Sequence, residues 1–145
     1  MATIAGLYEA HHRSCDEAFA DAENAAAEGA WDQAGTTTAH FVSLLELHLR
    51  SEEETLFPAF EAKTGMQGGP TAMMRLEHGQ MRSLLGSLSA AVAARSGDDF
   101  AGAAETLLVL MQQHNLKEEN ILYPMCDRAL DDAALLETIA RQLSS

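Results

Sequence analysis

The sequence predicts an all-α protein, an up-down-up-down four-helix bundle with a short C-terminal helix. Alanine, leucine, glutamate and methionine dominate the 145 residues, and the β-branched and aromatic runs typical of strands are missing. Glycine, proline and aspartate clusters fall where long helices would end. Four long helical segments with short connections between them are typical of such a bundle.

The first half of the chain predicts two of these helices. One is expected over about residues 3–28, with Gly29 ending it. The next covers about residues 32–63, where Asp32 caps or opens the helix. Pro58 lies inside this second helix and predicts a bend, because proline cannot donate a backbone hydrogen bond.

The second half of the chain has the same organisation. A glycine-rich loop over residues 65–70 ends in Pro70, which suits the first turn of a third helix that reaches about residue 94. A break at residues 96–99 precedes a fourth helix over about residues 99–127. A short amphipathic tail follows, with its apolar positions at Leu135, Leu136, Ile139 and Leu143.

The composition narrows the range of partners and compartments. Nine Lys and Arg residues against 22 Asp and Glu give a formal net charge of -13, so we expect no nucleic acid and no membrane surface as a partner. The length predicts a single domain over residues 1–145. No segment resembles a signal peptide, which favours a cytoplasmic protein. Cys15 and Cys126 are then expected to be buried thiols.

The chain also repeats itself at an offset of 66 residues. The repeat pairs His12 with His78, His48 with His114, Glu52 with Glu118, and Pro58 with Pro124. Its longest stretch consists of two copies of H-x-x-x-E-E-x-x-L-aromatic-P. The repeat as a whole includes four of the six histidines. A repeated set of metal-binding side chains predicts a symmetric metal centre.

Helical periodicity places one repeated histidine on the inward face of each long helix. In H-x-x-x-E the imidazole and the carboxylate project from the same face one turn apart, so both can reach a common ion. Buried carboxylates cost several kcal/mol each unless a cation compensates them. The sequence therefore predicts a metal site built from His12, His48, Glu52, His78, His114 and Glu118.

The types of ligand indicate the metal. Mixed nitrogen and oxygen ligation without thiolate is typical of iron and also tolerates manganese or zinc. If two ions share Glu52 and Glu118 as bridges and take two histidines each, every ion has four protein bonds. An octahedral ion then keeps about two free positions, enough for a bridging oxo or hydroxo group and one exogenous ligand. We therefore expect the site to bind or react with a small molecule.

These motifs resemble those of the hemerythrin-like proteins with an HHE cation-binding domain, and the resemblance covers about residues 4–128. It rests on His12 followed by Cys15-Asp16, His48-x-x-x-Glu52 with Leu-Phe-Pro, Gly69-Pro70 leading into Glu77-His78, and His114-x-x-x-Glu118 with Leu-Tyr-Pro. It implies a four-helix bundle around two non-haem iron ions, bridged by carboxylates and by an oxo or hydroxo group. It also implies that the four histidines are terminal ligands and the two glutamates are bridges.

The resemblance further implies a range of functions. Such a protein senses, scavenges or reacts with oxygen, nitric oxide or peroxide, or it holds labile iron for stress response or iron-centre repair. Oxygen-carrying members place a second histidine one turn after the first on the third helix, whereas Arg82 stands there in this chain. The chain is thus more similar to bacterial relatives with fewer histidines than to a dedicated oxygen carrier. Whether it is an enzyme, and which protein it partners, is left open.

Several other residues compete for a place at the site. His11 lies about 100° round the helix from His12, which predicts a surface side chain. His40 is too far along the helix axis to reach the same ion, and could only support a ligand or line the access path. Asp16 could make an extra bond at the site or a hydrogen bond to one of the ligands. Glu119 is a reserve ligand. Arg82 is expected to face solvent or form an ion pair, or to lie over the site as a charged gate.

Two alternative classes remain. A ferritin-like carboxylate di-iron enzyme would place Glu-x-x-His on two helices, and only the segment Glu9-Ala-His-His12 fits that pattern. A metal-free helical interaction module would leave the inward histidines and glutamates unexplained. Iron analysis of the purified protein separates this last class from the others.

Overall fold

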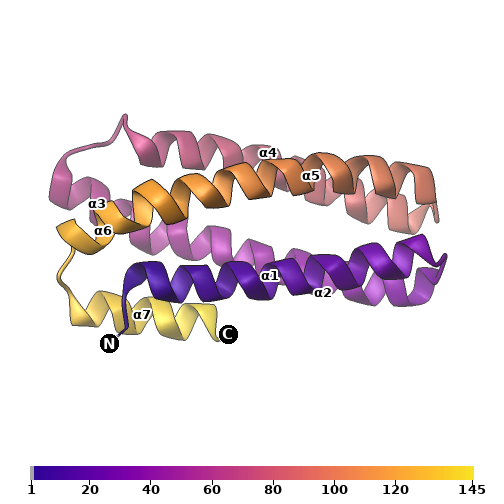
Figure 1. Ribbon diagram of the computed structural model, residues 1–145, viewed down its shortest axis with the longest axis horizontal. Helices are drawn as coiled ribbons and strands as arrows, with labels where there is room; N and C mark the ends of the chain where they lie inside the picture. Colours follow the sequence, from indigo (N-terminus) through magenta and orange to yellow (C-terminus); the bar gives the residue numbers. More distant parts are fainter. Residues whose placement is uncertain (1) are drawn as a thin grey trace.

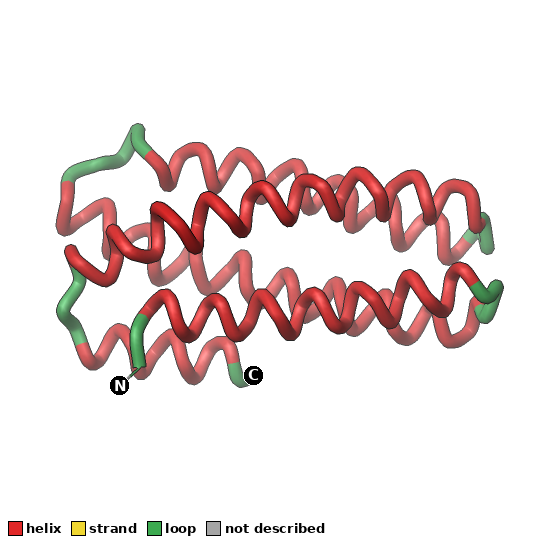
Figure 2. The backbone as a smooth tube through the Cα atoms, viewed as in Figure 1, coloured by secondary structure: helices red, strands yellow, loops and turns green. Residues whose placement is uncertain are grey.

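The structure is a computed structural model that describes residues 2–145, and these residues form helices and no strand (Figure 2). The elements are α1 (Ile4–Ala27), α2 (Trp31–Ser51), η1 (Glu52–Leu56), α3 (Phe57–Thr64), α4 (Pro70–Ala93), α5 (Gly97–Lys117), η2 (Glu118–Leu122), α6 (Tyr123–Ala129) and α7 (Ala133–Leu143). The predicted all-α class is confirmed.

The four long helices run side by side along the molecule. Figure 1 shows the α1–α2 and α4–α5 turns at one end, and α3, α6, α7 and the N-terminus at the other. Helix α1 packs against α2 and α5, and α4 packs against α5 and α2. This arrangement closes a helical bundle, as the periodicity of the sequence predicts.

Local chemistry explains where α1 begins and ends. The hydroxyl of Thr3 accepts a hydrogen bond from the backbone N–H of Gly6 at 2.9 Å and caps the helix. The carboxylate of Asp127 accepts bonds from the backbone N–H groups of Ile4 and Ala5, at 2.9 and 3.2 Å, and ties α1 to α6. At the other end Gly29 adopts a φ of 69°, a conformation that glycine takes without steric cost.

Where the sequence predicts a bend at Pro58, the structure has a π-helical turn just before the proline. The backbone N–H of Phe57 donates to the carbonyl of Glu52, five residues earlier, so η1 separates α2 from α3. The same bond joins Tyr123 to Glu118 in η2. In both copies the residue that follows is a proline, which has no N–H to continue the α-helical pattern and whose ring crowds the preceding turn.

The apolar core consists of two clusters with the predicted metal site between them. One fills the bundle toward the α1–α2 and α4–α5 turns and includes Phe41, Leu88 and Leu107. The other lies under α3, α6 and α7, and includes Phe60 and Ile139. Along α1 and α4, and along α2 and α5 together with the π-helical turns that follow them, the repeated histidine lies between residues of the two clusters. The bundle thus holds a polar layer in the middle of its core.

Two smaller predictions are also confirmed. Cys15 and Cys126 are free, buried thiols, one in each apolar cluster. The C-terminal tail forms α7, which Asp132 caps by accepting bonds from the backbone N–H groups of Ala134 and Leu135. Among the residues described, no helix has both the length and the apolar character needed to cross a membrane.

Candidate metal centre

The structure brings the six predicted ligands together in the polar layer. Each long helix contributes one histidine, and the π-helical turns η1 and η2 each begin with one of the glutamates. All six side chains belong to residues that are at most 4% exposed. The group comprises His12, His48, Glu52, His78, His114 and Glu118. The position of these residues fits the predicted site, while their role as ligands stays a prediction.

One half of the centre lies between α4 and α5. Nε2 of His78 is 3.1 Å from Oε1 of Glu52, and Nε2 of His114 is 3.3 Å from Oε1 of Glu118. These four residues each offer a donor atom, and the atoms all lie within 4.8 Å of one another. We refer to this group as the His78/His114 half. Its donors are spaced closely enough to bind one cation together.

The other half lies between α1 and α2. Nε2 of His12 is 3.1 Å from Oε1 of Glu118, and Nε2 of His48 is 3.6 Å from Oε2 of Glu52. Donor atoms of His12, His48 and Glu118 again lie within 4.8 Å of one another. In this His12/His48 half, Glu118 also belongs to the first group of donors. The carboxylates therefore lie between the two pairs of histidines.

Four donor atoms of the His78/His114 half have no hydrogen-bond partner although they are buried. They are Nε2 of His78, Nε2 of His114, Oε1 of Glu52 and Oε2 of Glu118. A buried polar group without a partner costs roughly 1–3 kcal/mol, and a charged one costs more. A cation among these atoms would compensate all four. The residues present therefore fit a metal ion.

Three of the four imidazoles also donate a hydrogen bond from Nδ1 to a carboxylate on the side away from the centre. The pairs are His12 with Glu119 at 2.7 Å, His78 with Glu53 at 2.8 Å, and His114 with Glu77 at 2.8 Å. Such bonds hold the ring in place and leave Nε2 free for a metal. Glu119, the predicted reserve ligand, contacts the outer nitrogen of His12 instead of joining the donor groups.

Two of these carboxylates are paired with cations. Both terminal nitrogens of Arg82 lie 2.8 Å from Glu53, and the guanidinium also bonds Glu46. Burial alone would raise the pKa of Glu53, but hydrogen bonds from Arg82 and His78 outweigh it and lower this pKa. Lys117 pairs with Glu77 in the same way. Of the roles predicted for Arg82, the ion pair is the one observed.

The prediction for His11 is wrong. The residue is only 6% exposed, and its Nδ1 lies 2.8 Å from Nδ1 of His48. Helix α2 packs so broadly against α1 that it covers both histidines, although they are one residue apart. Burial, followed by the electrostatic effect of the neighbouring His48, lowers the pKa of His11 to about 4. His40 and Asp16 are exposed and do not join the centre.

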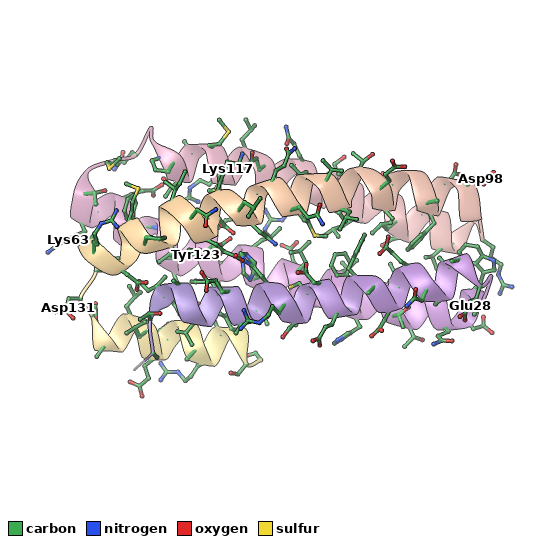
Figure 3. The ribbon with its side chains drawn as sticks, viewed as in Figure 1. Glu28, Lys63, Asp98, Lys117, Tyr123 and Asp131 are labelled. Carbon is green, nitrogen blue, oxygen red and sulfur yellow. The ribbon has the colours of Figure 1, made fainter. Side chains whose placement is uncertain are left out.

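Tyr123 is a site residue that the sequence reasoning missed. Its hydroxyl lies 2.6 Å from Oε2 of Glu52 and 2.9 Å from Oε1 of Glu118. It is also 3.3 Å from Nε2 of His12 and 3.4 Å from Nε2 of His48. Figure 3 places the residue in the part of the bundle near α1 and α6. The phenol therefore lies among the donors of the His12/His48 half.

The local backbone explains why Tyr123 was missed. In an α-helix a residue five positions after Glu118 would lie about 140° away from it round the axis. In the π-helical turn η2, residue i+5 instead stacks over residue i. The one available signal was the aromatic position of the repeat, which is Tyr123 in one copy and Phe57 in the other.

The carboxylates of the centre raise the pKa values of two of its histidines. Burial alone would lower the pKa of His114, but the charges of Glu118 and Glu52 and the hydrogen bond to Glu77 raise it to about 9. The pKa of His12 is raised too, since bonds and charges from Glu118 and Glu119 outweigh its burial. Protonated imidazoles thus take part of the role that a metal ion would fill.

The fold and the buried donors define a helical-bundle protein with a cation site of histidines and carboxylates. The family model described as the hemerythrin HHE cation binding domain matches residues 3–126, so the chain belongs to this family. The family resemblance drawn from the motifs is thereby confirmed. No curated protein and no solved structure matches the chain significantly.

Proposed function

We propose that the centre holds two iron ions, and that the protein senses, scavenges or reacts with a small ligand or holds labile iron. The ligand classes are oxygen, nitric oxide and peroxide, and the setting is stress response or the repair of iron centres. The observation that carries this proposal is the set of four buried donor atoms without hydrogen-bond partners, two nitrogens and two oxygens, on four residues whose donor atoms lie within 4.8 Å of one another.

The two overlapping donor groups support a pair of ions over a single ion. His78 and His114 would hold one ion, and His12 and His48 would hold the other. Glu52 and Glu118 lie between the two pairs and would be shared. Iron bound by nitrogen and oxygen donors supplies open positions and redox chemistry for a small ligand.

Burial supports a small ligand. The six donors are at most 4% exposed and lie between two apolar clusters, so a bulky substrate cannot reach them without opening the bundle. A molecule of two or four atoms needs only a brief local opening of side chains. The same burial excludes bulk water from the donors, which strengthens their electrostatic interactions with a bound cation.

The test combines metal analysis with spectroscopy. The protein is purified, loaded anaerobically with ferrous iron and freed of excess metal, and its iron content per chain is measured. We expect about two ions per chain. Absorption spectra before and after separate additions of oxygen, nitric oxide and hydrogen peroxide then show which ligand changes the centre. A chain that retains one ion or none after loading contradicts the proposal and favours another metal or a metal-free module.

A further inference from the structure

His48 differs from the other three imidazoles in the partner of its outer nitrogen. Its Nδ1 meets the Nδ1 of His11 at 2.8 Å, whereas His12, His78 and His114 each meet a carboxylate. The rings of His11 and His48 are stacked, with centroids 5.0 Å apart and planes 19° from parallel. Among the contacts of the four outer nitrogens, the symmetry of the repeat is therefore broken at His48.

Metal binding would decide which nitrogen of each ring carries hydrogen. An imidazole that binds a cation through Nε2 carries its hydrogen on Nδ1. His48 then donates from Nδ1, and Nδ1 of His11 must be the bare nitrogen that accepts. The hydrogen of His11 lies on Nε2, a buried atom with no hydrogen-bond partner. His11 thus serves as a neutral acceptor.

A neutral acceptor holds and polarises an imidazole less strongly than a carboxylate does. A carboxylate on the outer N–H raises the basicity of the ligating nitrogen, and removing such a partner typically lowers metal affinity by 10–100-fold. Two of the three carboxylates share their charge with Arg82 or Lys117, yet each still carries a formal negative charge that His11 lacks. His48 is therefore the weakest donor of the four histidines.

We propose that His11 is a positioning residue that makes the ion of the His12/His48 half the first to leave. The inference rests on the two-iron centre proposed above and deepens it. One ion is held firmly between His78 and His114, and the other is exchangeable. Such a centre suits a protein that gives up or takes up ferrous iron more than one that retains both ions permanently.

The test follows iron release from the full chain. Protein loaded anaerobically with ferrous iron is mixed with a coloured ferrous chelator, and absorbance is followed with time. We expect two phases, each of about one ion per chain. His11→Gln keeps a neutral acceptor and should leave both rates close to those of the wild type. His11→Leu removes the acceptor and should speed the fast phase roughly 10–100-fold.

The decisive variant should slow iron release instead of speeding it. His11→Glu supplies the carboxylate that the other three histidines have, and it should slow the fast phase by roughly 10–100-fold. A residue that only fills space would speed release in every variant, so slower release separates the two roles. The matched control is Glu77→Gln, which removes the carboxylate of His114 and should speed the slow phase alone.

The outcomes separate the two proposals. Failure to load about two ions per chain contradicts the proposed function. Two ions that leave in a single phase, or a fast phase that His11→Leu leaves unchanged, overturn the inference alone. Circular dichroism and thermal melts check that each variant folds. If His11→Glu does not fold, the comparison of His11→Gln with His11→Leu still decides, because only the second removes the acceptor.

Discussion

The hydroxyl of Tyr123 donates a 2.6 Å hydrogen bond to Oε2 of Glu52. Glu52 begins η1, and Tyr123 directly follows η2, which is the counterpart of η1 in the sequence repeat. The same hydroxyl lies 2.9 Å from Oε1 of Glu118. One phenol thus links the two carboxylates that are shared between the halves of the centre. The equivalent residue of the other copy is Phe57, so the six donors are symmetric while their surroundings are not.

Tyr123→Phe should change the spectrum of the iron-loaded protein. The phenol oxygen lies within 3.4 Å of Nε2 of His12 and Nε2 of His48, so it would be within reach of an ion bound in that half. We expect a changed visible absorption spectrum of the ferric protein, with iron content retained. Tyr8→Phe is the control, because its hydroxyl bonds Ser51 at 2.8 Å instead of a donor. Identical spectra for wild type and Tyr123→Phe would rule out this role.

Glu52→Ala and Glu118→Ala should each lose most of the bound iron. Each carboxylate lies between both pairs of histidines, so its removal weakens both halves at once. Because metal binding stabilises the fold that contains the site, iron should raise the melting temperature of the wild type and not of these variants. Iron content and thermal melts with and without iron measure the effect. Glu54→Ala, at an exposed position nearby, should behave as the wild type.

The metal-free protein should lose stability as the pH rises from about 6.5 to 9. The pKa of His114 is raised from 6.5 to about 9, so its protonation stabilises the folded state fully below the first value and no longer above the second. Chelator-treated protein melted across this range should show the decline, and His114→Gln should reduce it. Iron-loaded protein should show a smaller decline, since a bound ion replaces the proton. A flat profile in the metal-free wild type would contradict this assignment.

Asp127→Ala should destabilise the fold without affecting the centre. Its carboxylate caps α1 by accepting bonds from the backbone N–H groups of Ile4 and Ala5, and loss of such a cap costs about 1 kcal/mol. Urea denaturation of the metal-free protein measures this cost, and iron content should stay unchanged. Asp131→Ala, at an exposed position beyond α6, should cost less than about 0.5 kcal/mol. Equal losses in the two variants would show that the cap has little effect.

Much of the centre could be predicted because its main features are local or repeated. The spacing of His48 and Glu52 places both on one face of one helix, and the copy at His114 and Glu118 does the same. Periodicity then directs His12 and His78 inward on the remaining helices. The structure places all six residues within one buried layer, as the sequence predicts.

The residues that were misjudged depend on contacts across helices or on a departure from α-helical geometry. His11 is buried because α2 covers it, and nothing within α1 reveals how far that cover extends. Tyr123 reaches Glu118 because η2 is a π-helical turn. Glu77 and Glu53 accept hydrogen bonds from His114 and His78, which lie on neighbouring helices. The angular positions of residues around a single ideal α-helix cannot predict any of these contacts.

The sequence by itself therefore determined the all-α bundle, the positions of the breaks between its helices and the repeated donors. It could do so because helix periodicity, capping and proline effects act within a few residues. Only the tertiary structure decided what surrounds those donors. The partner of each outer nitrogen depends on the distance and rotation between packed helices, which no local pattern encodes. That is why the symmetric repeat produces an asymmetric centre, with His11 behind His48 and Tyr123 between the two carboxylates.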